Sequence, residues 1–304
     1  MSRYTVGEVL NLYRKKLDMT LEELASGIMS AGNLSRIERG IAMPSKCHLE
    51  ALFEKLGVNP NSLTSIFLSK EDAEYQKITD LLDYHLGNDN AKDAGVLIEQ
   101  LENDAGFMKD KLNRQYIAAA KAANSKDWDS NPAEVLKVLT DALTLPHTED
   151  LGEQIETYFL TQVDFRMFNM MAILHYKLGD PEKAIKILYG LKKNVEKRCI
   201  DKIERGRRYP AIIANLTKYL EETGQHKEVI KICAEGRAVC LETQYLELLP
   251  NIVVSEACSR HAIGDIETSA DLLCSAYHTL KLYERYHEAN QIKNYAKDEL
   301  GIVL

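Results

Sequence analysis

The chain has 304 residues, a formal net charge of −8 at neutral pH and six cysteines. This length accommodates two or more domains. The cysteines include no CxxC pair with zinc-ligand spacing, the start carries no signal-like segment, and no apolar run approaches membrane-spanning length. We therefore expect a cytoplasmic protein with reduced thiols, no metal ion and no cofactor.

A helix-turn-helix pattern occupies the segment TLEELASGIMSAGNLSRIERG. Thr20 is a good N-cap, and Glu23 three residues later completes a capping box, so a helix is predicted to follow Thr20. Gly27 permits a tight turn, Ser30 caps a second helix, and Gly40 ends it. This arrangement is typical of proteins that place the second helix in the major groove of DNA.

The second predicted helix has an inward and an outward face. Leu34 and Ile37 are three residues apart and are expected to point into the core. Base readout is assigned to Asn33, Ser35 and Arg36, whose polar groups match base edges. The residues predicted to contact DNA are Ser30, Ala31, Gly32, Asn33, Ser35, Arg36 and Arg39.

Two amphipathic segments flank the pair, VGEVLNLYRKK before it and HLEALFEKLGV after it, and each predicts another helix. Residues 5–66 resemble the Cro/repressor-type (XRE) helix-turn-helix family in LSRIERG and LEALFEKLGVNPNSL, and the turn resembles that of the Rgg group. The resemblance implies a DNA-binding domain over residues 1–66. It also implies that Arg14 pairs with a buried Glu38 instead of contacting DNA. Arg39 is either a DNA contact or a solvated side chain.

Charge is divided unevenly along the chain. Residues 1–66 hold eight basic and seven acidic side chains, a balance of +1, whereas the remainder carries −9. We expect the acidic part to face away from the phosphates. A domain of +1 binds DNA weakly alone, so we infer a homodimer that doubles the contacts.

Helical patterning continues to the end of the chain. The segment around residues 62–75, which joins the two parts, carries the apolar side chains Leu63, Ile66, Phe67 and Leu68. They predict a docked linker helix over residues 67–76, followed by a repeat domain over residues 77–304 that binds a peptide and forms the dimer.

Five two-helix units recur in this second part, with close-packing positions at Ala94, Val135, Ala184, Val229 and Ser269. Their spacing exceeds the roughly 34 residues of the simplest tetratricopeptide repeat, which the third unit, LGDPEKA, resembles. Prolines are expected only at helix boundaries, at Pro132, Pro146, Pro181, Pro210 and Pro250. A last helix over about residues 277–300 is expected to cap the stack. The predicted fold is all-α: a helix-turn-helix domain followed by a tetratricopeptide-like right-handed α-superhelix.

The first helices of such units line a concave wall that suits an extended peptide. Peptide backbone is matched by amide side chains, which donate and accept hydrogen bonds. Asn215 lies where tetratricopeptide proteins commonly carry an asparagine that clamps the backbone. The predicted peptide contacts are Asn169, Asn215, Asn251, Arg166, Tyr219 and Tyr245. For each asparagine, an exposed helix residue without a ligand is the alternative.

The combined layout is similar to that of the Rgg, PlcR and PrgX (RRNPP) peptide-sensing regulators of Gram-positive bacteria. This resemblance implies a cytoplasmic, quorum-sensing homodimer that binds promoter DNA and a short signalling peptide, with no membrane partner. An alternative is an XRE-family repressor whose helical domain binds a partner protein, as in antitoxin or phage-repressor systems. The chain has no P-loop, HExxH or GxSxG motif, so we expect no enzymatic activity.

Overall fold

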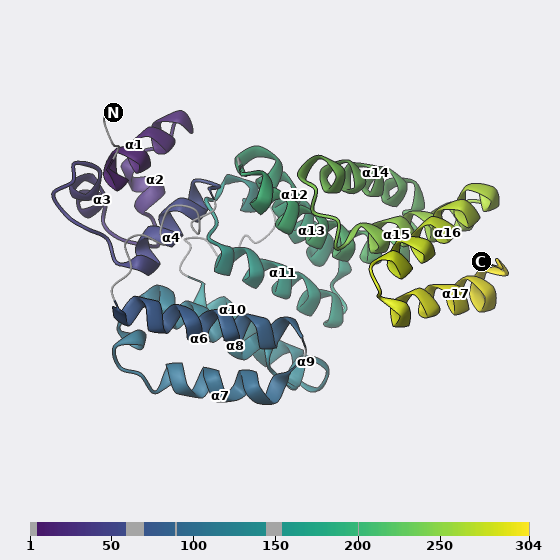
Figure 1. Cartoon of the computed structure of the whole chain (residues 1–304), viewed down its shortest axis with the longest axis horizontal. Coiled ribbons are helices and arrows are strands. Elements are labelled where there is room, and N and C mark those ends of the chain that lie inside the picture. The colour runs from purple at the N-terminus through teal and green to yellow at the C-terminus, as the bar shows by residue number, and fades with distance from the viewer. Residues whose placement is uncertain (1–4, 59–69, 89, 144–153, 200, 304) are drawn as a thin grey trace. The chain divides into compact units, whose positions relative to one another are not determined.

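The computed structural model describes residues 5–58, 70–88, 90–143, 154–199 and 201–303. Helices and turns account for these residues, and none of them is in a strand, which confirms the all-α class (Figure 1). Within the same ranges, no helix has both the length and the apolar character needed to cross a bilayer.

The chain divides into two compact units. Unit 1 comprises Met1–Ile187 and Lys197–Asp201, and unit 2 comprises Leu188–Glu196 and Lys202–Leu304. The helix α12, Pro181–Arg198, therefore contributes residues to both units.

Four short helices begin unit 1. They are α1 (Val6–Lys16), α2 (Leu21–Ala25), α3 (Ala31–Glu38) and α4 (Lys46–Lys55). A hydroxyl side chain caps each of them at the N-terminus, namely Thr5, Thr20, Ser30 and Ser45. All four predicted helices of this region are thus confirmed, including the capping box before α2.

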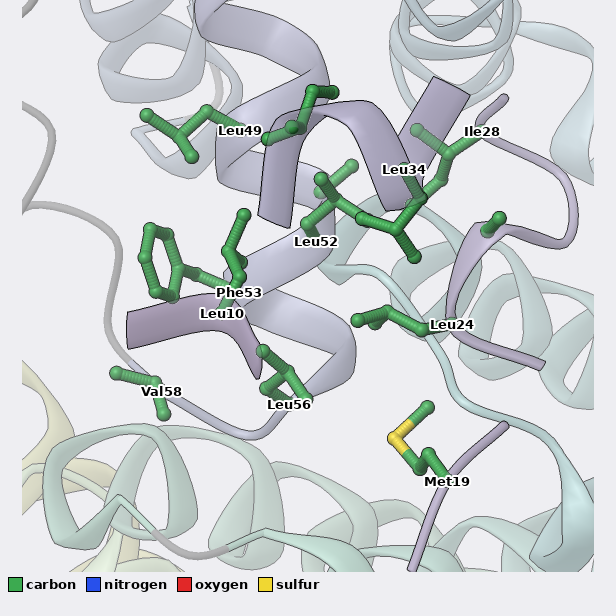
Figure 2. Close-up of a cluster of buried hydrophobic side chains, with 13 residues drawn as sticks. Leu10, Met19, Leu24, Ile28, Leu34, Leu49, Leu52, Phe53, Leu56 and Val58 are labelled. Carbon is green, nitrogen blue, oxygen red and sulfur yellow. The ribbon is translucent and has the colours of Figure 1, made fainter. Parts of the chain in front are cut away.

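The four helices surround one apolar cluster (Figure 2). Leu10 from α1, Leu24 from α2, Leu34 from α3 and Leu52 from α4 are completely buried within it. Burial of each leucine contributes about 1.5–3 kcal/mol. Because every helix contributes one, the cluster fixes the position of α3 relative to the other three.

The remaining helices form pairs in chain order. They are α6 (Lys70–Gly87) with α7 (Ala91–Glu102); α8 (Lys111–Ala123) with α10 (Pro132–Ala142), separated by the short α9 (Asp127–Ser130); α11 (Gln162–Lys177) with α12; α13 (Lys202–Glu222) with α14 (His226–Thr243); and α15 (Leu249–Ala262) with α16 (Ile266–Leu282), followed by α17 (Tyr286–Leu300). Contacts between the paired helices are shown for four of the five predicted pairs, all but α11 with α12. The aligned close-packing residues of the five pairs are all buried: Ala94, Val135, Ala184, Val229 and Ser269.

One proline expectation is wrong. Pro132, Pro181 and Pro250 begin helices as predicted, whereas Pro210 lies inside α13 and is buried. Proline removes the hydrogen bond to the carbonyl four residues earlier, here that of Gly206. Gly206 packs directly against Thr243 at the end of α14 and against Tyr245 just after it, so tertiary packing keeps this stretch helical despite the lost bond. Pro146 lies outside the described residues.

The predicted helix over residues 277–300 is also wrong as a single element. It is divided between α16 and α17 by a turn at Tyr283 to Arg285, where Glu284 adopts a left-handed φ of 60°. The Arg285 amide then bonds to the Leu280 carbonyl at 2.9 Å and closes the turn. No glycine or proline marks this break in the sequence.

Within unit 1, the four-helix domain contacts the first repeats directly. Leu112 of α8 and Phe159 pack against its core. The Glu54 carboxylate accepts the Gln162 amide at 2.7 Å, at the start of α11. The predicted boundary at residue 66 and residues 67–69 of the predicted linker lie outside the described residues. Residues 70–76 of that linker form the start of α6.

Candidate DNA-contacting helix and repeat-domain site

Local hydrogen bonds fix the starts of α2 and α3, and a glycine lies in the turn between them. The Thr20 hydroxyl accepts the Glu23 amide at 3.1 Å, and the Glu23 carboxylate accepts the Thr20 amide at 2.7 Å. Gly27 in the turn has a φ of 74°, a left-handed conformation that glycine adopts without a Cβ clash. The Ser30 hydroxyl then accepts the Asn33 amide at 3.2 Å and starts α3.

A buried ion pair supports the far end of α3. The Arg14 guanidinium donates from Nε and Nη2 to both oxygens of Glu38, at 2.6 and 2.7 Å, and from Nη1 to the Met19 carbonyl at 2.8 Å. Glu38 is 7% exposed, and its hydrogen bonds raise the pKa of Arg14. The predicted structural pairing of Arg14 with Glu38 is therefore confirmed. Arg14 is occupied by this pair, which ties α1 to α3.

The outer face of α3 carries the side chains predicted to contact DNA. Asn33, Arg36 and Arg39 are exposed, as are Ser30 and Gly32, while Ala31 and Ser35 are half-buried. Arg39 donates from Nε to the Ser35 carbonyl at 3.2 Å. Among the described residues, the Arg36 guanidinium makes no hydrogen bond or ion pair, while the Arg36 carbonyl accepts the Ile41 amide at 2.8 Å. Asn33 and Arg36 are thus presented by a helix whose opposite face is fixed in the core.

Two residues that the sequence reasoning missed determine this geometry. Gly7 of α1 lies against the end of α3, where a methyl group on Gly7 would stand 2.1 Å from the Ile37 carbonyl oxygen. Lys55 of α4 is 4% exposed and donates to the Ser26 carbonyl in the turn. Burial lowers the pKa of Lys55 to about 8. In the sequence, the only signals were a glycine within an amphipathic helix and a lysine on an otherwise buried face.

The predicted peptide contacts are divided between the units. Asn169 and Arg166 lie on α11 in unit 1, where Arg166 forms a two-pronged ion pair with Asp83 at 2.8 and 2.9 Å. Asn215 of α13 is half-buried and Asn251 of α15 is exposed, both in unit 2. The three asparagines do occupy three successive first helices.

The two tyrosines predicted beside them have different environments. Tyr219 is 3% exposed and belongs to the interior of unit 2. Tyr245 is half-buried, with the Arg207 guanidinium 6.0 Å from the centre of its ring and its Cβ close to Gly206. Tyr245 is therefore the more accessible of the two to a ligand.

Residues 10–63 match the helix-turn-helix family. No curated protein sequence matches the chain. Its fold is similar to that of PlcR from Bacillus thuringiensis in complex with the peptide PapR7 and DNA, with 13% identity, a TM-score of 0.60, and coverage of 95% of this chain and 99% of that chain. The apo form of the competence regulator ComR from Streptococcus vestibularis has 17% identity, a TM-score of 0.55, and coverage of 97% and 98%. At these identities the likeness shows the fold alone.

Proposed function

We propose that this chain, with its helix-turn-helix domain and the fold of PlcR and ComR, is a cytoplasmic transcriptional regulator of the RRNPP type. It binds promoter DNA as a homodimer through α3 and responds to a short signalling peptide bound by the repeat helices. The observation that carries the DNA part is the exposed pair Asn33 and Arg36 on a helix fixed from behind by Glu38 and Arg14.

Dimerisation follows from the weak charge of the DNA-reading part. A net +1 over residues 1–66 gives little phosphate attraction. Two copies on one operator double the contacts and select two half-sites by their spacing. The residues after 66 carry a net charge of −9, which repels the phosphates and disfavours binding of DNA by any other surface of the protein.

DNA binding is tested by selection from a random duplex pool with the full-length protein, followed by titration of the selected sequence. Replacing Arg36 by Ala should cost about 1–3 kcal/mol and relax the preference at one base pair, since a base contact is lost. Arg39→Ala should instead weaken all sequences alike and reduce the salt dependence, as loss of a phosphate contact does. Lys227→Ala removes the same charge from an exposed site in α14 and should change neither. Equal losses for Arg36→Ala and Lys227→Ala would refute the assignment of α3.

Peptide control requires a difference in affinity between two states. A peptide that binds DNA-competent and DNA-incompetent dimers equally changes nothing. The factor by which peptide changes DNA affinity must equal the factor by which DNA changes peptide affinity. Synthetic peptides from small reading frames beside the gene provide the ligands, and both affinities are measured on the same protein.

The asparagines are tested in the same assay. Asn215→Ala should abolish the peptide response while leaving DNA binding without peptide intact. Lys218→Ala, an exposed change on the same helix, is the matched control. An unchanged peptide dose curve for Asn215→Ala would show that the ligand binds elsewhere. A response to a partner protein alone would favour the antitoxin-like or phage-repressor-like alternative.

A further inference from the structure

Three metal-ligating side chains converge where the helix-turn-helix domain meets the repeats. Cys47 and His48 occupy the first turn of α4, and Asp110 is the N-cap of α8. The His48 Nε2 atom lies 3.0 Å from Asp110 Oδ2, and the sulfur, imidazole and carboxylate atoms all lie within 4.8 Å of one another. All three residues are half-buried.

We propose that Cys47, His48 and Asp110 bind a divalent ion of the zinc type, which joins the DNA-reading domain to the first repeats. Zinc takes thiolate, imidazole and carboxylate ligands in tetrahedral geometry, and three protein ligands leave one position for water. Ligand atoms about 2.1 Å from one ion lie about 3.4 Å apart in a tetrahedron. His48 and Asp110 therefore need to separate by only a few tenths of an ångström.

The orientation of the ligands is already supported. Asp110 uses its Oδ1 atom to accept the Leu112 amide at 2.9 Å, which leaves Oδ2 directed at His48. The Ser45 hydroxyl lies 3.7 Å from the Cys47 sulfur. Hydrogen bonds from neighbouring groups orient the side chains that bind a metal ion. The Leu112 amide does this for Asp110, and the Ser45 hydroxyl does it for Cys47.

The local charge favours a cation. The carboxylates of Asp110 and Glu50 place negative charge beside Cys47. The same carboxylates that oppose a thiolate attract a dication, although Lys46 partly offsets Glu50 across an ion pair of 3.2 Å. On binding, the S–H bond breaks, its electron pair forms the sulfur–metal bond, and the proton leaves to water.

The sequence concealed this site because its ligands are far apart in the chain. Cys47 and His48 are adjacent, and Asp110 lies on a different helix pair, so no recurring ligand spacing appears. Only the packing of α4 beside α8 brings them together. Both helices belong to unit 1, and the inference is independent of the proposed peptide response.

Titration of untagged, reduced full-length protein with Co²⁺ tests the proposal. One equivalent should give the visible bands of tetrahedral cobalt and a near-ultraviolet thiolate-to-cobalt absorption, and Zn²⁺ should displace it. Cys47→Ser should remove the thiolate absorption, and Asp110→Asn, which keeps an N-capping side chain, should weaken binding at least about tenfold. Cys258→Ser alters another half-buried thiol, 3.9 Å from the Tyr295 hydroxyl, and should leave the spectrum unchanged.

Thermal unfolding supplies a second readout. Zn²⁺ should raise the melting temperature of wild type but not of Cys47→Ser, because an ion that binds only the folded state stabilises it. The proposal would be overturned if wild type is saturated with Co²⁺ without a thiolate-to-cobalt absorption, or if that absorption persists in Cys47→Ser. A loss of stability in His48→Gln that is equal with and without Zn²⁺ would also overturn it, because that is the behaviour of an ordinary ion pair.

Discussion

Gly7 provides the sharpest test of how α3, the proposed DNA-contacting helix, is held in place. In Gly7→Ala, the new methyl group would stand 2.1 Å from the Ile37 carbonyl oxygen and 2.8 Å from that of Glu38. Both atoms belong to the backbone of α3, so no side-chain rotation relieves the contact. Either α1 must move away from α3 by about 1 Å or the end of α3 must distort.

The free-energy cost can be worked from these distances. Overpacking a core costs about 1–3 kcal/mol, and a clash with a fixed backbone atom belongs at the upper end. Alanine recovers up to about 1 kcal/mol relative to glycine in a helix interior, and less at Gly7, which is the second residue of α1. We therefore expect Gly7→Ala to lower the free energy of unfolding of the four-helix domain by about 2 kcal/mol.

A matched substitution isolates the clash from helix propensity. Gly95 also lies within a helix, α7, but a methyl group there would meet only the Asn124 amide nitrogen at 3.6 Å, an ordinary contact. Gly95→Ala should therefore stabilise its helix by about 0.5–1 kcal/mol. The two identical chemical changes are predicted to have opposite signs.

Hydrogen exchange by mass spectrometry measures the effect locally, and this matters because a chain with two units need not unfold in one step. Peptides covering α1 and α3 should exchange faster in Gly7→Ala and be unchanged in Gly95→Ala. If Gly7→Ala protects α3 as well as wild type does, the close approach of α1 to α3 is wrong.

Three further outcomes follow from contacts of the same domain. The pKa of Lys55 is lowered to about 8 in the folded protein, against about 10.4 in the unfolded chain, so the unfolded state binds more protons between these two pH values. The free energy of unfolding should therefore rise from pH 8 to pH 10. Parallel denaturant titrations should show a smaller rise in Lys55→Met. Arg14→Met leaves Glu38 buried without its cation and should cost about 3 kcal/mol in the same titrations, whereas loss under 1 kcal/mol would contradict a structural role. Ser30→Ala removes the cap of α3 and should cost about 1 kcal/mol, while Ser30→Asp should restore it.

The helix-turn-helix was predictable because its signals are local. Thr20, Glu23 and Ser30 act within one turn of their own positions, and the structure shows each of their hydrogen bonds. The recurrence of small residues likewise located the helix pairs, since positions such as Ala184 and Ser269 must be buried wherever two helices approach closely.

The errors came from positions where distant parts of the chain decide the outcome. Pro210 remains helical because Gly206 packs against Thr243 and Tyr245, which no local rule includes. Glu284 adopts a left-handed φ that usually marks a glycine, so the sequence carried no signal for the end of α16.

The contacts of Leu112 and Phe159 with the four-helix core bear on how this protein can be engineered. A fragment cut after residue 58 would expose the apolar surface that these two side chains cover and would lose the amide of Gln162 that Glu54 accepts. Chimeras that transplant the helix-turn-helix domain onto another repeat domain should therefore retain the repeat segment as far as α11, because the exchangeable module is larger than the domain the sequence outlines.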